Sequence, residues 1–134
     1  MSSFRIFDIA GAGMSAQSVR LNTVASNLAN AESVSGDPGN VYRARHPVFE
    51  AVDNGDVGAS VKVDGIVENQ AAPEKRYDPG NPLADPAGYV YAPNVNSVEE
   101  MVDMISASRS YQNNVEVMNT ARNQMLATLK LGQG

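Results

Sequence analysis

Residues 11 to 16 carry the one motif in the chain that could bind a nucleotide. Gly11-Ala-Gly-Met-Ser-Ala16 matches the pattern G-x-G-x-x-A, in which glycines let a pyrophosphate approach the start of a helix. A dinucleotide site also needs a buried strand before the motif and another strand about twenty residues after it. Ile6 and Ile9 could belong to the first strand, but a helical pattern follows as far as Ala31. We therefore predict small residues inside a helix and no nucleotide cofactor.

Metal binding and acid–base catalysis would require histidines, cysteines or carboxylates that face one another. His46 is the only histidine and the chain has no cysteine, so a zinc site or a Ser-His-Asp arrangement would lack partners. Asp53-Asn-Gly-Asp56 has only part of a calcium loop and predicts a turn. Glu99 and Glu100 are neighbours in sequence, and neighbouring residues of a helix diverge by about 100°. We therefore predict no catalytic, metal or cofactor site, and no enzyme.

The last forty residues, 95–134, predict one long amphipathic helix. Residues at alternating steps of three and four form a coiled-coil seam: Met101, Met104, Ser108, Tyr111, Val115, Met118, Arg122, Met125 and Leu129. Ser108 and Arg122 interrupt this seam with polar side chains, and Val98 and Ile105 widen one flank. Ser97 followed by Glu100 fits a capping box. A helix of this length needs a second helix against its seam.

The first thirty residues predict that second helix. Its apolar residues recur with a seven-residue period, with Val24 at an intervening position: Phe7, Met14, Leu21 and Leu28. The chain is therefore expected to have an N-terminal helical arm over residues 1–33 and a C-terminal helical arm over residues 95–134.

The middle of the chain, residues 34–94, differs from both arms. It holds all seven prolines, and turn-forming clusters separate short extended segments. Residues 41–49 predict an extended segment, and residues 58–69 predict a strand or a short hairpin with Asp64-Gly65 as a turn or bulge. Residues 88–92 predict a last short strand, and residues 77–82 a rigid loop. The predicted fold is mainly α with a small β-containing insert, and its long terminal helices pair as an antiparallel coiled coil.

Charge and hydropathy exclude several classes of partner. The net charge is −5 and the basic residues are scattered, whereas a nucleic-acid site would require a clustered basic stripe. No apolar run approaches the length of about 20 residues that spans a bilayer. The N-terminus lacks the basic and apolar regions of a cleavable signal peptide. We expect a chain that neither binds nucleic acid nor spans a membrane.

A single pair of these helices buries little apolar surface for the number of residues it orders, so neighbouring chains must complete the burial. The arms are expected to be labile alone and helical on assembly. The predicted assembly interface comprises apolar seam residues and small polar residues: Phe7, Met14, Leu21, Val24, Asn27, Leu28, Asn30, Met101, Met104, Ile105, Tyr111, Val115, Met118, Met125 and Leu129.

Several stretches of the chain resemble flagellar rod and hook proteins. Residues 15–31 (SAQSVRLNTVASNLANA) and 42–49 (YRARHPVF) are similar to the N-terminal signature of that family. Residues 78–85 (DPGNPLAD) resemble the middle of its proximal-rod members, and residues 99–112 and 114–121 resemble their C-terminal signature. The likeness covers nearly the whole chain and is weakest over residues 51–59.

The resemblance implies a structural subunit of the proximal rod, the drive shaft of the flagellum. Such subunits are exported unfolded by the flagellar type III apparatus and assemble helically in the periplasm. The implied partners are copies of the chain, other rod proteins and the adaptor that joins the rod to the export gate. The alternative interpretation is a helical adaptor whose methionine-rich helix docks on a partner without forming a filament.

Overall fold

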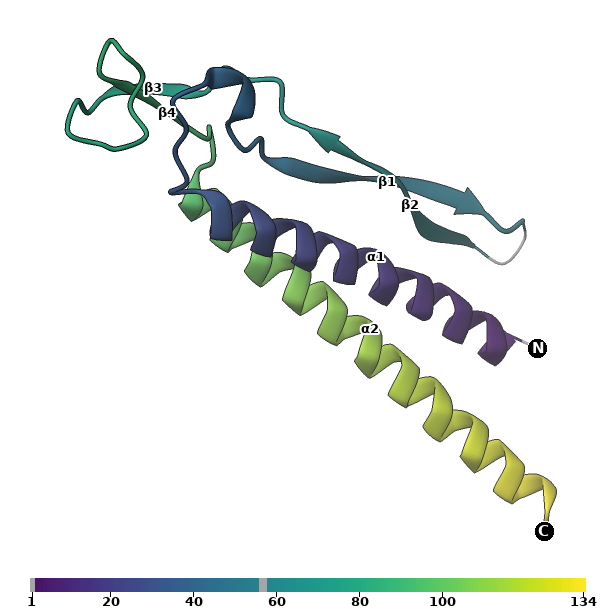
Figure 1. Ribbon diagram of the computed structural model, residues 1–134. Helices are drawn as coiled ribbons and strands as arrows, with labels where there is room; N and C mark the ends of the chain where they lie inside the picture. Colours follow the sequence, from purple (N-terminus) through teal and green to yellow (C-terminus); the bar gives the residue numbers. More distant parts are fainter. Residues whose placement is uncertain (1, 56–57) are drawn as a thin grey trace.

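The computed structural model describes residues 2–55 and 58–134 (Figure 1). In chain order the elements are α1 (Ser2–Asn30), the short 3-10 helix η1 (Pro38–Asn40), β1 (Arg45–Asp53), β2 (Ala59–Glu68), β3 (Glu74–Tyr77), β4 (Tyr89–Ala92) and α2 (Ser97–Gly132). The two long helices and the β-containing segment between them agree with the predicted fold class. Within the described residues, no helix combines the length and apolar character that a membrane crossing requires.

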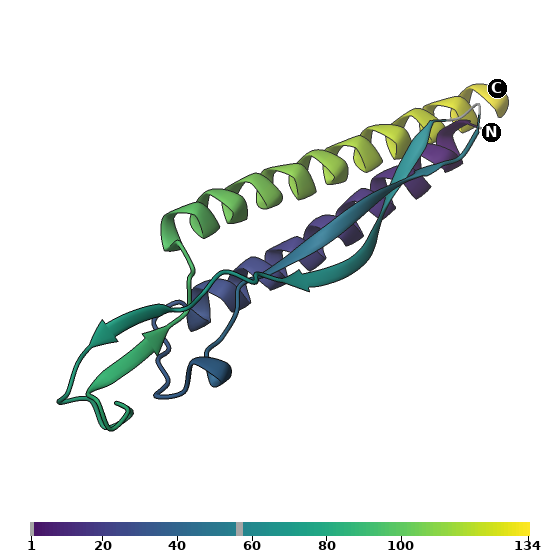
Figure 2. The ribbon, with the colours of Figure 1, turned by 90° about the horizontal axis from the view of Figure 1, so that it is seen from above.

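Helix α1 lies between the β1–β2 hairpin and α2 (Figure 1). The chain runs along α1 in one direction and returns along α2 in the other, and the two helices are in contact. Seen from above, the hairpin extends along the length of α1, and the small β3–β4 sheet projects beyond the end where α1 stops and α2 starts (Figure 2). The molecule is therefore elongated, and most of its surface belongs to two helices and one hairpin.

Helix α2 begins one residue earlier than the predicted capping box required. Asn96 is the N-cap, and its side-chain oxygen accepts hydrogen bonds from the backbone N–H groups of Val98 (3.0 Å) and Glu99 (3.4 Å). The prediction of a Ser97–Glu100 capping box was therefore wrong: Ser97 lies inside the helix, and Glu100 is only 5% exposed. Asn96 satisfies two backbone donors that would otherwise be free at the helix start.

The nucleotide-like motif lies wholly inside α1. Residues 6–16 are helical, so no strand precedes Gly11, and the prediction of small residues within a helix is confirmed. The turn predicted at residues 53–56 is present where it is described: Asp53 Oδ1 accepts a hydrogen bond of 2.9 Å from the Gly55 N–H. Asp56 lies outside the described residues.

Strands β1 and β2 form an antiparallel hairpin. Arg45 pairs with Glu68 at the open end and Asp53 pairs with Ala59 near the turn. The register shifts between Val48 and Phe49, which face Gly65 and Val63, so Asp64 is the extra residue of a bulge. This confirms one of the two conformations predicted for Asp64-Gly65.

The second sheet contains a strand that the sequence pattern did not predict. Strand β3 pairs antiparallel with β4: Glu74 faces Ala92 at one end, and Tyr77 faces Tyr89 at the other. All four residues of β3 are exposed. The Tyr77 and Tyr89 rings meet edge to face with centroids 5.2 Å apart. The predicted strand at 88–92 is therefore confirmed, with β3 as its partner.

The core is thin. Its buried apolar residues are small: Ala10, Ala16, Val24, Val41, Ala44, Val90, Ala92, Ala107 and Ala121. The largest side chains with less than 2% exposure are those of Val90 and Asn27. Burial of apolar area scales with side-chain size, so this core stabilises the chain much less than a core of leucines and phenylalanines would.

Candidate assembly interface

Two contacts along the middle of α1 fix how the helices lie against each other. The Asn114 side chain fills the space beside Gly13, so that a Cβ at Gly13 would lie 2.8 Å from Asn114 Nδ2. One heptad further along, Arg20 Nη2 donates a hydrogen bond of 2.8 Å to Asp103 Oδ1, and the two side chains form an ion pair. These contacts are made by a glycine, a small amide and charged groups, not by large apolar residues.

The third contact, one more heptad along α1, is the most buried polar site. The Asn27 amide Nδ2 donates to the Arg45 carbonyl oxygen (2.9 Å) and to Glu100 Oε2 (3.0 Å). Its Oδ1 accepts from the Tyr42 hydroxyl (2.8 Å) and from the Arg45 backbone N–H (2.9 Å). The side chain is fully buried and uses both donors and both acceptor sites of its amide. Asn27 thus joins α1, α2, the start of β1 and the segment before it.

Tyr42 shares the environment of this site. Burial of the phenol raises its pKa above the usual value of 10, because the charged phenolate would lose water. The nearby Arg45 guanidinium lowers the same pKa, and the Glu100 and Glu68 carboxylates raise it. The neutral hydroxyl that donates to Asn27 is therefore the favoured form.

The face of α2 that turns toward α1 repeats with alternating steps of four and three residues. Its members are buried or half-buried: Glu100, Met104, Ala107, Tyr111, Asn114, Met118, Ala121 and Met125. Four members of this face belong to the predicted seam: Met104, Tyr111, Met118 and Met125. The other four each lie one residue before a predicted seam position: Glu100, Ala107, Asn114 and Ala121. Small or polar residues at these earlier positions let the α1 backbone approach closely, which a row of methionines and valines would prevent.

The predicted interface residues fall into three groups. Val24 and Asn27 are buried. Most of the others are half-buried: Phe7, Met14, Leu21, Leu28, Asn30, Met104, Tyr111, Val115, Met118 and Met125. Met101, Ile105 and Leu129 are 49%, 55% and 60% exposed, so within a single chain they have little apolar cover. Whether neighbouring subunits cover them stays a prediction.

Large apolar residues are exposed at both ends of α2. Near its start, Val98, Met101, Val102 and Ile105 are each 49–65% exposed and lie at helical spacings of three and four; we call them the outer stripe. Near its end are Leu126, Leu129 and Leu131, the C-terminal leucines, of which Leu131 is 84% exposed. Contiguous exposed apolar residues typically mark an interaction surface.

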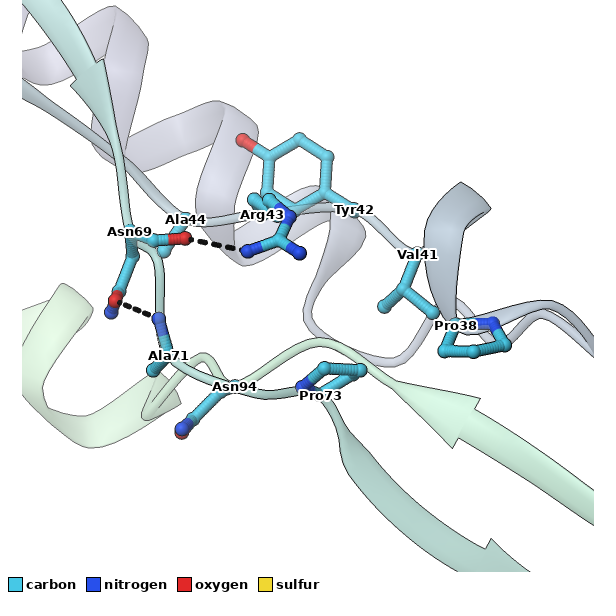
Figure 3. A pocket seen from close by; sticks show the side chains of 9 residues that line it. All are labelled: Pro38, Val41, Tyr42, Arg43, Ala44, Asn69, Ala71, Pro73 and Asn94. Atoms are coloured by element: carbon cyan, nitrogen blue, oxygen red, sulfur yellow. Dashed lines mark hydrogen bonds between the residues drawn. The ribbon is translucent and has the colours of Figure 1, made fainter.

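The junction between the helices and the small sheet encloses a cavity of about 10 Å³ (Figure 3). Arg43 Nη1 donates to the Asn69 carbonyl oxygen (3.3 Å), and Asn69 Oδ1 accepts from the Ala71 N–H (2.8 Å). Ligand pockets are usually hundreds of cubic ångströms, whereas this space suits about one water molecule. The junction is a packing contact between chain segments and does not resemble a small-molecule site.

Sequence reasoning found only part of the set that holds α1 against α2. Asn27 was predicted as an interface residue. Gly13 and Arg20 recur with it every seven residues but were missed, because a search for apolar periodicity passes over a glycine and an arginine. Glu100 was assigned to the helix cap, although it accepts from Asn27. A search for small and polar residues at a heptad spacing would have found this face.

Comparison with known proteins finds family models that match both terminal helices. A family model described as flagella basal body rod protein matches residues 7–36, which include most of α1. A second model, for the C-terminal region of flagellar basal body rod FlgEFG proteins, matches residues 87–131, which include β4 and nearly all of α2. The two terminal helices therefore have the sequence features of the flagellar basal-body rod class.

Full-length relatives narrow this class. The flagellar basal-body rod protein FlgC of Salmonella typhimurium (strain LT2) is 54% identical over 134 residues, covering 99% of this chain and all of that protein. FlgC of Escherichia coli O6:H1 is 56% identical over 136 residues with the same coverage, and FlgC of Aquifex aeolicus is 46% identical over 124 residues, 91% of each chain. The chain belongs to the FlgC family. It is a structural subunit of the flagellar basal-body rod and not an enzyme.

Proposed function

We propose that the chain assembles helically with copies of itself and with other rod proteins into the proximal rod, the drive shaft that transmits torque from motor to hook. The observation that carries this proposal is the exposure of large apolar side chains at both ends of α2. A chain with so thin a core gains stability when neighbours cover these residues. The residues predicted as the assembly interface would then be covered in the rod.

We propose further that the arms pair as an antiparallel coiled coil. The helices run in opposite directions (Figure 1). Three α1 residues at a heptad spacing contact α2: Gly13 lies against Asn114, Arg20 pairs with Asp103, and Asn27 binds Glu100. On α2, buried or half-buried residues recur with the same spacing: Glu100, Ala107, Asn114 and Ala121. In this proposal residues 1–33 and 95–134 act as the two arms, and residues 34–94 form the middle region beside them.

The route to the rod is proposed from the resemblance to rod proteins, and the thin core supports it. We propose that the chain is exported unfolded through the flagellar type III apparatus into the periplasm, where it joins the rod beside the adaptor of the export gate. A thin core and long terminal helices suit this route, because little folding free energy opposes unfolding before export. The competing adaptor function predicts a small complex of fixed size and no extended assembly.

The test is a charge placed in the α1–α2 seam. Met118→Asp puts a carboxylate at a half-buried seam position, which costs several kcal/mol by desolvation. We expect the variant to be absent from purified basal bodies and its cells to be non-motile. Asn119→Asp, an exposed neighbour, is the matched control and should leave both unchanged. Normal motility with Met118→Asp would overturn the proposal.

A further inference from the structure

The exposed apolar residues of α2 are concentrated at its two ends. Between the outer stripe and the C-terminal leucines, the exposed positions are polar with the exception of Val117: Ser106, Arg109, Gln112, Asn113, Glu116, Asn119, Thr120, Arg122, Asn123 and Gln124. A helix with two separate apolar ends and a polar middle has two contact sites. A single α1 covers neither of them.

The C-terminal leucines are uncovered because α1 is shorter than α2. Gly13 lies against Asn114, and Ser2, the first described residue of α1, is eleven positions before Gly13. Because the helices run in opposite directions, the residue of α2 opposite Ser2 is eleven positions after Asn114, which is Met125. The end of α2 therefore runs past the beginning of α1 (Figure 1), and Leu126 and Leu129 have no α1 residue opposite them.

The outer stripe is uncovered for a different reason. Glu100, Met104 and Ala107 turn toward α1, and Val98, Val102 and Ile105 lie on the opposite side of the helix. No described element of the chain covers that side near the start of α2. The stripe thus requires a partner from outside the chain, whatever the position of α1.

The charges at the two ends of α2 are complementary. Residues 97–105 contain Glu99, Glu100 and Asp103 and no lysine or arginine. Glu100 accepts from Asn27 and Asp103 pairs with Arg20 of the same chain, so Glu99 is the exposed acid at this end. Residues 122–132 contain the exposed Arg122 and Lys130 and no acidic residue. These side chains offset the helix macrodipole, which is positive at the start of α2 and negative at its end. In a head-to-tail arrangement, the attraction between the end of one α2 and the start of another therefore comes from the side chains, with Lys130 or Arg122 near Glu99.

We propose that the C-terminal leucines of one copy pack against the outer stripe of a second copy. This inference rests on the proposed rod function and specifies the contact between copies. Met101 and Leu129 are 28 residues apart on one continuous helix, which separates them by roughly 42 Å, so one chain cannot bring its own two sites together. The contact is heterologous, and a heterologous contact repeats from copy to copy, giving an open helical assembly when the rotation between copies does not close a ring.

Engineered cysteines test this contact directly, since the chain has none of its own. In a Met101→Cys, Leu129→Cys double variant, oxidation of purified basal bodies should give a ladder of disulfide-linked multimers. A disulfide requires Cα atoms within about 7 Å, so each bond must join two chains. A Gln112→Cys, Asn119→Cys double variant, placed on the exposed polar middle of α2, is the control and should remain monomeric.

Single cysteine variants separate the possible outcomes. Met101→Cys alone and Leu129→Cys alone should not form dimers, because the contact joins unlike residues. Dimers from either single variant would indicate a symmetric contact and overturn the proposal. Failure to form the ladder while the chain is present in the basal bodies would also overturn it, with another rod protein as the occupant and the proposed function intact. Absence of the unmodified chain from basal bodies would instead contradict the proposed function.

A charge swap provides a second, independent measurement in the cysteine background. Glu99→Lys and Lys130→Glu should each lower the yield of the ladder about two- to fivefold, as expected for an exposed ion pair. The combination of both substitutions should restore the yield, because opposite charges face each other again. If the combined variant were as defective as either single change or worse, the two residues would not be in contact.

Discussion

The side chain of Asn27 donates a hydrogen bond of 3.0 Å to the carboxylate of Glu100, and the two residues are 0% and 5% exposed. This contact joins α1 to α2 at the end of the helix pair where α1 stops and α2 starts (Figure 1). The same amide binds both backbone groups of Arg45, so the position of the hairpin depends on it as well.

We expect Asn27→Ala to lower the free energy of unfolding by about 2–5 kcal/mol. The substitution leaves the Arg45 N–H and carbonyl group and the Glu100 carboxylate without their partner, and each buried polar group without a hydrogen bond costs about 1–3 kcal/mol. Urea unfolding followed by circular dichroism, in an osmolyte that stabilises the fold, measures the change. Asn113→Ala, at an exposed site of α2, should change it by less than about 0.5 kcal/mol.

The two glycines of α1 should respond differently to alanine. Gly11→Ala is expected to raise the free energy of unfolding by about 0.5–1 kcal/mol, because a Cβ there meets no atom within 4 Å and alanine favours the helix. Gly13→Ala should raise the free energy of unfolding by less, because its Cβ would lie 2.8 Å from Asn114 Nδ2. In an Asn114→Ala background the gain should return. Equal gains at both glycines in the unaltered chain would contradict the helix register.

Tyr42 predicts a loss of stability at alkaline pH. The folded-state pKa of its phenol is raised above 10, so between the unfolded and the folded pKa the unfolded chain binds fewer protons. The contribution of Tyr42 is complete below about pH 10 and is lost as the pH rises through the folded pKa. Tyr42→Phe should remove this part of the decline, whereas Tyr77→Phe, at an exposed site, should keep it. Parallel declines for the unaltered chain and Tyr42→Phe would count against the effect.

The purified chain in dilute solution should be less helical than in the rod. Helices α1 and α2 comprise 29 and 36 of the 134 residues, and the core between them is thin. We expect far-UV circular dichroism to show a smaller helix content at low concentration, with both termini open to proteolysis. Full helicity and protease-resistant termini in the dilute monomer would mean that neighbouring chains are not needed for folding.

Apolar periodicity predicted the two helices because both are long and carry seams with few interruptions. It also placed Met104, Tyr111, Met118 and Met125 on the face of α2 that turns toward α1, where they are half-buried. At the other positions of this face, the apolar pattern selected the next residue along the chain, such as Met101 in place of Glu100 and Val115 in place of Asn114. It detects side chains with large hydrophobic area, whereas the close approach of these helices depends on small side chains and hydrogen bonds.

The β-containing middle was predictable only in part. Alternating valines located β2, because this signal is local. The extended segment predicted at 41–49 overlaps only the first five residues of β1 (Arg45–Asp53), and the rest of that strand was missed. Strand β3 was not predicted because its sequence, EKRY, has no alternation of apolar and polar residues. All four of its residues are exposed. Its strand conformation depends on pairing with β4, a non-local partner that no short window of sequence includes.

The decisive measurement is a density map of the basal body that resolves side chains. We expect this chain to lie in the proximal rod with its terminal helices paired in opposite directions. We also expect Met101, Ile105 and Leu129, each about half exposed or more in the single chain, to be covered by neighbouring subunits. A map in which these three side chains face water, or in which the two helices separate and pair only with other proteins, would contradict these expectations.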